Sequence, residues 1–324
     1  MKVSVIVPIY NVSRFIEHCA ESLMKQTLDE VEYIFVNDAT PDNSMMLLRS
    51  VLKRYPNRAS QIKIVEHKQN KGLPAARNTG LAVATGEYIF HCDSDDYVEY
   101  DMLELLYDAA KEKEADFAWC DWFLSYDNNE RYMKQPSFEN SMDVLKAMLG
   151  GAMKYNVWNK LVKRNLFVEN DILFPSGHSM GEDMTMIRLA ACAKKVAYVD
   201  DALYHYVRSN SEAMTQSYNE RHLVDVHYNV DETIAFLVTK GLDTEKEMAF
   251  FKLNVKLPFL VTDSWDSYRR WNEWYPEANA YISVNKNIPW RTRLLQQMAA
   301  KKFYVGVWLY FQVIYRFLYT ILYK

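Results

Sequence analysis

Three carboxylates lie within four residues of one another at Asp93, Asp95 and Asp96, directly after the short apolar run of residues 88–90. Carboxylates this close repel each other unless a cation or hydrogen-bond donors compensate their charge. Mg²⁺ and Mn²⁺ take oxygen ligands from one or two carboxylates and complete their shell with water and substrate phosphates. The pattern therefore indicates a divalent-cation site at the end of a strand. The alternative is an acidic turn that caps the next helix, because Asp and Ser are favoured at helix N-caps.

The elements expected around this turn alternate between strands and helices. Short apolar runs predict strands at residues 3–7, 33–36, 62–65 and 88–90, and further strands at 115–120 and 203–207. Helices are expected over residues 13–24, 45–55 and 101–113, and one is expected to end near residue 85. This order predicts an α/β fold with a mostly parallel central sheet flanked by helices.

Polar side chains follow several of these strands at their carboxyl ends: Tyr10 and Asn11 after the first, Asp38 after the second, and the acidic turn after the fourth. In open sheets of this kind, ligands bind beyond the carboxyl ends of the strands. We therefore expect these side chains to serve one ligand, which weakens the reading of the acidic turn as a simple cap.

The composition sets broad limits on the protein. The 324 residues suffice for one large domain or two, and 49% of them are hydrophobic. A net charge of -4 does not favour nucleic-acid binding by the protein as a whole. The four cysteines are scattered singly, which favours reduced thiols in a cytoplasmic protein over disulfides or a zinc site. Because residues 1–4 lead directly into a strand, no signal peptide is expected.

Four motifs in order resemble the family 2 glycosyltransferases, which are inverting enzymes of the GT-A fold that use nucleotide-diphosphate sugars. They are Val5-Ile6-Val7-Pro8-Ile9-Tyr10-Asn11, Val36-Asn37-Asp38, Ala76-Arg77-Asn78-x-Gly80 and Asp93-Ser94-Asp95-Asp96. Each motif is weak alone, but four of them at family-like spacing are specific. The resemblance covers roughly residues 1–210.

The resemblance implies a role for each matching position. Tyr10 would lie against the base of the donor and Asp38 would bind the base edge. Arg77 would lie near the base and diphosphate, and Asp93 near the ribose and sugar. Asp95 would hold Mn²⁺ or Mg²⁺ on the phosphates, while Asp96 would be a support. The remaining implied donor-binding residues are Pro8, Asn11 and Ser94. The family loop after Asp38 usually begins with glycine, whereas this chain has Ala39, so a stiffer turn is expected.

An inverting transfer also needs a base that deprotonates the acceptor hydroxyl. The family places it in a Glu-Asp pair, which implies Asp183 as the base and Glu182 as an orienting or acceptor-binding group. The alternative is that these acids only complement the dipole of a following helix. Arg208 is a candidate for neutralising the diphosphate. His205 is a possible metal ligand, although a lone His in an aromatic strand is more often structural.

The acceptor side is expected around Trp158 and Lys160, which match a Trp-Asn-Lys-Leu segment of the family. A buried Trp and a strand-end Lys are the alternative. Residues 125–137 are expected to form a polar hairpin or loop near the acceptor.

The C-terminal part predicts an α-helical extension. Residues 303–324 are almost wholly apolar and aromatic, and their polar interruptions recur every four residues, at Gln312, Arg316, Thr320 and Lys324. One polar stripe beside basic residues favours a helix lying in the membrane interface. A spanning helix, a buried helix and a dimer interface are the alternatives. The expected domains are 1–215 (nucleotide-sugar binding and catalysis), 216–300 (helical extension) and 301–324 (membrane-surface anchor).

These expectations combine into one hypothesis. The protein would move one sugar from a nucleotide-diphosphate donor, with UDP favoured, to a hydroxyl of a glycan or lipid-linked glycan in surface polysaccharide biosynthesis. It would act in the cytoplasm at the inner face of the cell membrane. The alternatives are a non-catalytic glycan-binding or scaffold subunit and a sugar nucleotidyltransferase. A sugar nucleotidyltransferase would need a Gly-rich, basic loop after the first strand, and the loop at residues 8–11 has neither glycine nor charge.

Overall fold

The computed structural model describes residues 1–208 and 220–318, and its chain forms two compact units. The first unit comprises Met1–Asp143 and Tyr155–Lys240, and the second comprises Val144–Lys154 and Gly241–Lys324. This division differs from the expected domain boundaries. The first unit continues to Lys240 instead of ending at 215, and the boundary expected at 300 falls inside the second unit.

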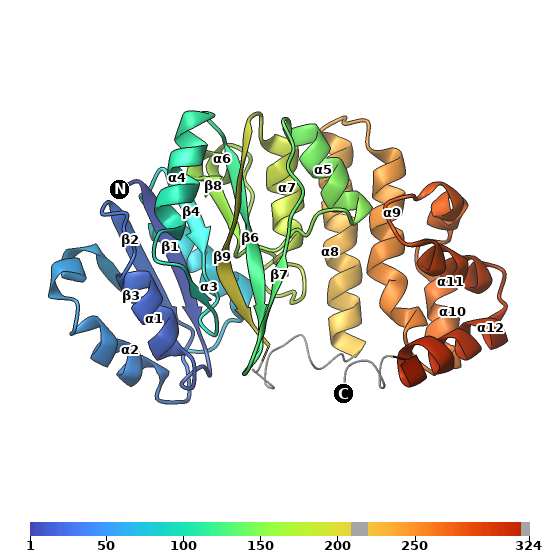
Figure 1. The fold of residues 1–324 in the computed structure, drawn as a ribbon, viewed down its shortest axis with the longest axis horizontal. Coiled ribbons are helices and arrows are strands. Elements are labelled where there is room, and N and C mark those ends of the chain that lie inside the picture. The colour runs from blue at the N-terminus through green and yellow to red at the C-terminus, as the bar shows by residue number, and fades with distance from the viewer. Residues whose placement is uncertain (209–219, 319–324) are drawn as a thin grey trace. The chain divides into compact units, whose positions relative to one another are not determined.

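The first unit is built on a mixed sheet with the strand order β3-β2-β1-β4-β8-β6-β9-β5, and β7 pairs with β6 (Figure 1). The pairs β1–β2, β1–β4, β2–β3 and β6–β9 are parallel, whereas β8 runs antiparallel to both neighbours. The strands are β1 (Val3–Ile9), β2 (Val31–Asn37), β3 (Ile62–Glu66), β4 (Tyr88–His91), β5 (Tyr97–Val98), β6 (Phe117–Ser125), β7 (Glu130–Met133), β8 (Lys160–Lys163) and β9 (Val196–Val207). The expected α/β fold is confirmed, with its parallel part concentrated in the first four strands.

Helices cover both faces of this sheet (Figure 1). Val3, Val5 and Val7 of β1 belong to one core with α1 (Ile16–Met24), α2 (Ser44–Leu52) and α4 (Met102–Glu112). Alternate residues of a strand face opposite sides, so Ile6 lies on the other face. There it meets Gly80 of α3 (Leu73–Val83), where an added Cβ would lie 2.4 Å from an Ile6 methyl carbon. A glycine is therefore needed for this close approach.

Three further helices complete the first unit: α6 (Arg164–Glu169), α7 (Met184–Cys192) and α8 (Glu220–Thr239). The second unit is helical, which confirms the expected C-terminal extension. Its helices are most of α5 (Ser141–Gly150), α9 (Glu245–Lys256), α10 (Trp265–Glu273), α11 (Trp290–Ala300) and α12 (Tyr304–Tyr310). Lys256 is buried in this unit, with its ammonium group 4.0 Å from the ring centre of Trp271, and burial lowers its pKa to about 7.

Residues 304–318, the last that the structure describes, do not form a single regular α-helix. After α12 the backbone continues as a π-helical stretch, Phe311–Leu318, in which Arg316 reaches Gln312 at 3.4 Å. The other two members of the expected polar stripe, Thr320 and Lys324, lie outside the described residues. Within residues 1–208 and 220–318, no helix is long and apolar enough to cross a membrane.

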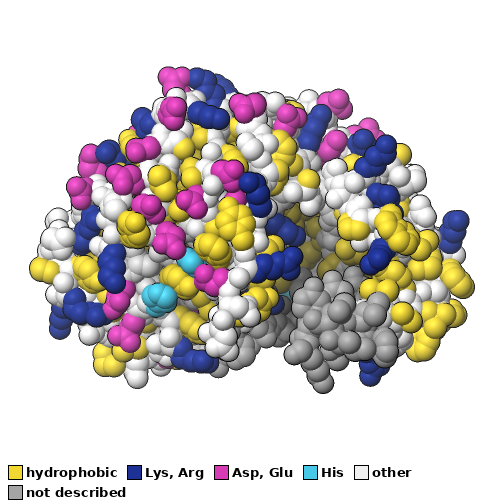
Figure 2. Space-filling view, viewed as in Figure 1, with side chains coloured by type: hydrophobic (Ala, Val, Ile, Leu, Met, Phe, Trp, Pro, Cys, Tyr) yellow, Lys and Arg dark blue, Asp and Glu magenta, His cyan; other side chains and the backbone are white. Residues whose placement is uncertain are grey.

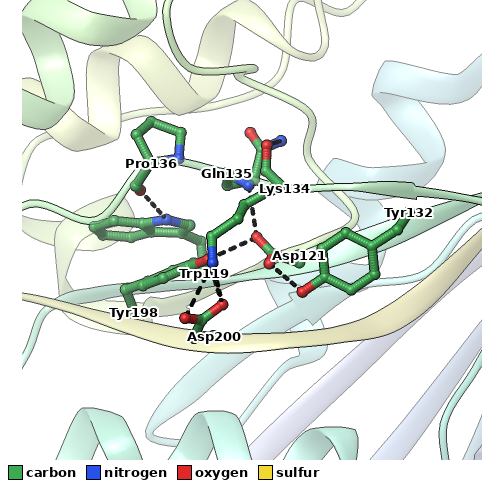
Figure 3. A network of polar contacts seen from close by, with 8 residues as sticks. All are labelled: Trp119, Asp121, Tyr132, Lys134, Gln135, Pro136, Tyr198 and Asp200. Atoms are coloured by element: carbon green, nitrogen blue, oxygen red, sulfur yellow. Dashed lines mark hydrogen bonds and ion pairs between the residues drawn. The ribbon is translucent and has the colours of Figure 1, made fainter.

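The expected polar hairpin at 125–137 is formed by β6 and β7, and it is anchored by Asp121 (Figure 3). The Asp121 carboxylate is fully buried and accepts hydrogen bonds from the hydroxyls of Tyr132 (2.5 Å) and Tyr198 (2.8 Å) and from the N–H of Gln135 (2.6 Å). The register between β6 and β9 shifts on both sides of Asp121, as at a β-bulge. Nearby, Lys134 and Asp200 form an exposed ion pair.

Two substitutions should distinguish these neighbouring contacts. Asp121→Ala removes the acceptor shared by three donors, so we expect it to lower the free energy of unfolding by about 2–3 kcal/mol. Asp200→Ala breaks an exposed pair and should lower it by less than about 1 kcal/mol. Urea denaturation of both variants provides the measurement. Equal losses would show that Asp121 does not anchor the hairpin.

Candidate functional site

A buried arginine joins the two acidic motifs of the sequence. The Arg77 guanidinium, on α3, lies 2.6 Å from Oδ1 of Asp93, and its side chain is only 3% exposed. Burial alone would lower the pKa of Arg77, but the carboxylates of Asp93, Glu182 and Asp183 raise it. The carboxyl end of β4 and the segment before α7, about ninety residues apart in sequence, thus face one cation.

Asp183 is held by the backbone and does not cap its own helix. The Val157 N–H donates a hydrogen bond of 2.9 Å to Oδ1 of Asp183, whose side chain makes no capping bond to α7. Burial raises the pKa of this carboxyl, and Asp93 adds to the rise, whereas Arg77 and Lys160 oppose it. These contacts favour a functional carboxylate over a simple helix-terminal acid. A carboxylate with a raised pKa is also the stronger base.

Glu182 is buried beside Asp183, and its Oε1 has no hydrogen-bond partner within the described part of the chain. Burial raises the pKa of Glu182, and Arg77 opposes that rise. A buried polar atom without a partner is costly. The vacant acceptor is therefore suited to a hydroxyl or amide of a bound molecule.

The acidic turn after β4 divides into one structural carboxylate and two that lie nearer the surface. Asp96 is buried, where it accepts hydrogen bonds from the Tyr204 hydroxyl (2.6 Å) and the Val207 N–H (2.8 Å). Burial raises the pKa of Asp96, as do the charges of Asp95 and Asp93. Asp96 thus supports the turn, while Asp93 and Asp95 remain half-buried.

No group of three or more His, Cys, Asp or Glu side chains suited to a metal ion occurs in the described parts of the chain. The residues present still fit a Mg²⁺ or Mn²⁺ ion, because such ions bind through one or two carboxylates and take their other ligands from water and phosphates. The half-buried Asp95 offers such a carboxylate.

The contacts of His205 favour its structural role over that of a metal ligand, because both of its ring nitrogens are occupied. They lie 2.7 Å from Glu130 and 2.9 Å from Glu99. The ring is also stacked on Tyr97 with 4.2 Å between centroids and on Phe123 with 4.9 Å. His205 therefore fastens β9 to β5 and to the β6–β7 hairpin.

The loop after β1 is held against the loop after β2. The Asn11 N–H donates to the Thr40 hydroxyl at 2.8 Å, and the Ser13 N–H donates to Asp42 at 2.8 Å. Ala39 adopts a φ of 54°, in the left-handed region that the family's glycine would favour. Tyr10 lies at this edge with 48% of its surface exposed, so its ring is accessible to a ligand.

Besides Arg77, three of the expected donor-binding residues are buried. Pro8 belongs to β1, where it pairs with Val36, instead of starting the loop. Asp38 is buried, and its carboxylate contacts His67 (2.6 Å) and the N–H groups of Lys71 (2.8 Å) and Gly72 (2.9 Å). A contact of Asp38 with a nucleobase stays a prediction. Ser94 is also buried, in the turn after β4.

Both residues expected on the acceptor side are buried. Trp158 is buried and stacks on Tyr204 and Tyr206, at centroid distances of 4.4 and 5.3 Å. Lys160 is 1% exposed and donates to Asn159, and burial lowers its pKa to about 7. Lys160 therefore acts on Asp183 electrostatically and offers little surface to an acceptor. Arg208 is exposed, and its guanidinium lies 5.9 Å from the Tyr206 ring centre.

Three residues of this region were missed by the sequence analysis. His91 is buried beside Arg77, which together with burial lowers its pKa, so the ring is neutral. Phe174 lies 5.5 Å from the Arg77 guanidinium. Asn78 donates to the Phe174 carbonyl and accepts from its N–H, both at 2.9 Å. Asn78 stood in a quoted motif, whereas nothing in the local sequence marks Phe174.

The comparisons agree with the motifs and the sheet. The sequence model described as "Glycosyl transferase family 2" matches residues 4–188. "Uncharacterized glycosyltransferase EpsJ" of Bacillus subtilis is 35% identical over 224 residues, which are 66% of this chain and 63% of that protein. "Poly(ribitol-phosphate) beta-glucosyltransferase" of Bacillus spizizenii is 32% identical over 224 residues, 67% of this chain and 34% of that protein. The chain thus spans less than two thirds of either relative.

A solved structure shares the fold. The crystal structure of S. aureus TarS 1-349 in complex with UDP-GlcNAc superposes with a TM-score of 0.72 and 21% identity, covering 96% of this chain and 92% of that one. This likeness confirms the GT-A architecture. The match of the sequence model over residues 4–188, more than half of the chain, shows that the chain belongs to glycosyl transferase family 2.

Proposed function

We propose that this glycosyltransferase moves one sugar from a nucleotide-diphosphate sugar to a hydroxyl of a glycan or lipid-linked glycan, with inversion at the anomeric carbon. The observation that carries the proposal is the position of Asp183. It is a carboxylate of raised pKa held by a backbone N–H, facing the same arginine as the acidic turn. A non-catalytic glycan-binding subunit would not need this coupled arrangement.

Asp183 takes the proton of the acceptor hydroxyl as that oxygen attacks the anomeric carbon. The nucleoside diphosphate leaves from the opposite face of the sugar. Glu182 offers its unpartnered Oε1 to a second hydroxyl of the acceptor and so orients it. Arg77 is too buried to bind the donor directly, so its role is to hold Asp93 and the two acids in place.

The negative charge that develops on the diphosphate needs compensation. Asp95 would hold a Mn²⁺ or Mg²⁺ ion, which supplies positive charge to the phosphate oxygens when bound. Arg208 is exposed directly after β9, and we assign it the role of compensating the same negative charge with its guanidinium group. The UDP preference is supported by the fold shared with TarS, whose structure contains UDP-GlcNAc.

One relative suggests the biological setting. Poly(ribitol-phosphate) beta-glucosyltransferase, by its name, acts on poly(ribitol-phosphate), and we propose a polymeric or lipid-linked glycan acceptor for this chain as well. We place the reaction in the cytoplasm at the inner face of the membrane, where a lipid-linked acceptor would be available.

The C-terminal part offers a surface for that membrane. Large apolar side chains on α11, α12 and the residues that follow are exposed, and Lys or Arg side chains stand among them (Figure 2). The exposed apolar residues are Trp290, Leu294, Phe303, Val305, Trp308, Leu309 and Val313, and the exposed basic residues are Arg291, Lys301, Lys302 and Arg316. Such a combination suits an interface with anionic lipid headgroups. A second copy of the chain is the rival occupant.

The base assignment predicts the behaviour of Asp183→Asn. We expect UDP release from a UDP-sugar to fall by about 10²- to 10⁴-fold, because the amide cannot accept the proton. Binding of UDP should be unchanged. In the wild type, activity should fall as the pH drops through the raised pKa of Asp183, which lies above the usual range of an Asp. Asp201→Asn, an exposed acid on β9, serves as control. Full activity in Asp183→Asn would refute the assignment.

The metal assignment predicts a change in nucleotide binding. Asp95→Ala should weaken binding of UDP in the presence of Mn²⁺ and leave the weaker metal-free binding unchanged, because only the metal-bridged contact is removed. Isothermal titration calorimetry with and without Mn²⁺ measures both. Wild-type binding that does not respond to Mn²⁺ or Mg²⁺ would contradict the assignment.

The membrane surface predicts vesicle binding. The full chain should co-sediment with vesicles that contain anionic phosphatidylglycerol, and Phe303→Ser with Leu309→Ser should reduce this binding, since both side chains are exposed. Val168→Ser, at an exposed apolar residue of α6, is the matched control. Unchanged binding of the double variant, or a dimer that this variant dissociates, would count against the membrane surface.

A further inference from the structure

A cavity of about 190 Å³ lies within the first unit, next to the segment that carries the base. Three stretches of chain line it: the loop between α6 and α7, one residue of α7, and the middle of α8. The lining residues are Leu173, Pro175, Ser176, His178, Gly181, Arg188, Tyr228, Asn229, Glu232 and Thr233. None of them has a role in the site described above.

The lining is polar and contains a cation that is only partly satisfied. Arg188 donates to the Leu173 carbonyl at 3.1 Å, but its buried Nε has no partner within the described residues. Burial lowers the pKa of Arg188, and the charge of Glu232, another lining residue, opposes this effect. The ring of His178 stacks on Tyr228 at 3.8 Å and supplies flat apolar surface.

The cavity is separate from the Arg77 cluster but shares a segment with it. Glu232 and Tyr228 are the charged groups that shift the pKa of Arg188. The pKa of Glu182 is instead shifted by groups that include Arg77 and Asp93, so the two sets do not overlap. The shared segment is the loop before α7. Its Ser176 hydroxyl accepts from Asn78 next to Arg77, and Ser176 also lines the cavity.

The loop is packed closely against α8 just before the base. An added Cβ on Gly181 would lie 2.1 Å from the side chain of Asn229, whose amide donates to the Ser179 carbonyl at 2.9 Å. Next along the chain are Glu182 and Asp183. A molecule held in the cavity therefore lies against the same loop as the proposed base.

We infer that this cavity binds one sugar residue of the acceptor, next to the residue whose hydroxyl Asp183 deprotonates. Hydroxyl groups both donate and accept, which matches a lining that offers Arg188 and Asn229 as donors and Glu232 as an acceptor. The opposed charges of Arg188 and Glu232 disfavour a phosphate or another simple anion. The volume is below the roughly 300–1,000 Å³ of sites for drug-sized ligands, so it suits a single ring. The inference rests on the proposed function.

The test measures sugar binding and UDP binding in parallel on the full chain. Saturation-transfer NMR with methyl glycosides of glucose, galactose and N-acetylglucosamine should show binding of at least one of them to the wild type. Glu232→Trp, at an exposed position of the lining, should abolish that signal by filling the cavity. Glu232→Gln should weaken the binding by about tenfold through loss of a charged hydrogen-bond acceptor. UDP binding should stay the same throughout.

Val238→Trp is the matched control, because Val238 is exposed on α8 and does not line the cavity. It should leave sugar binding unchanged. Sugar binding that survives Glu232→Trp, or the absence of binding to the wild type, would overturn the inference. A wild type that fails to bind UDP would instead overturn the proposed donor, so the two failures are distinguishable.

Discussion

One buried cation determines how the site is assembled. Arg77 is almost fully enclosed, yet it meets carboxylates that come from the end of β4 and from the segment before α7. Removing one partner of a buried ion pair leaves an uncompensated charge that typically costs about 3–5 kcal/mol. The loop before α7 is additionally clamped by Asn78, the neighbour of Arg77 on the same helix. One turn of α3 therefore aligns the end of β4 with the segment before α7.

Around this cation the side chains have separate tasks. Asp96 and His205 form hydrogen bonds with other side chains of the protein and so stabilise the acidic turn and the neighbouring strand β9. Asp183 and Glu182 keep raised pKa values because burial is only partly offset by Arg77. Asp96 and Glu182 are both buried acids, but Asp96 accepts hydrogen bonds from Tyr204 and Val207, whereas Oε1 of Glu182 has no partner within the described residues.

Much of this arrangement could be predicted from the sequence, because it depends on local patterns. The apolar runs marked the first four strands, the ordered motifs marked Asp93 and Asp95, and the Glu-Asp pair of the resembled family marked Asp183. Other features depend on contacts between distant segments. Four-residue β8 has no alternation that would reveal its antiparallel pairing, and the burial of Lys160 follows from that pairing. The donors that enclose Asp38 come from a loop some thirty residues later, and no local pattern shows them.

The proline at position 8 has a consequence for the shape of the sheet. The Ile6 carbonyl accepts a hydrogen bond from the Cys92 N–H on the β4 side, so the backbone of Pro8, two residues later, faces the same side. Proline has no N–H to donate, which stops the ladder between β1 and β4 at that level. The two chains can therefore separate beyond His91, where β1 ends its pairing with β4. The end of the β1–β4 ladder, at the point where the strand order reverses, is thus encoded in the main chain by one residue without an N–H.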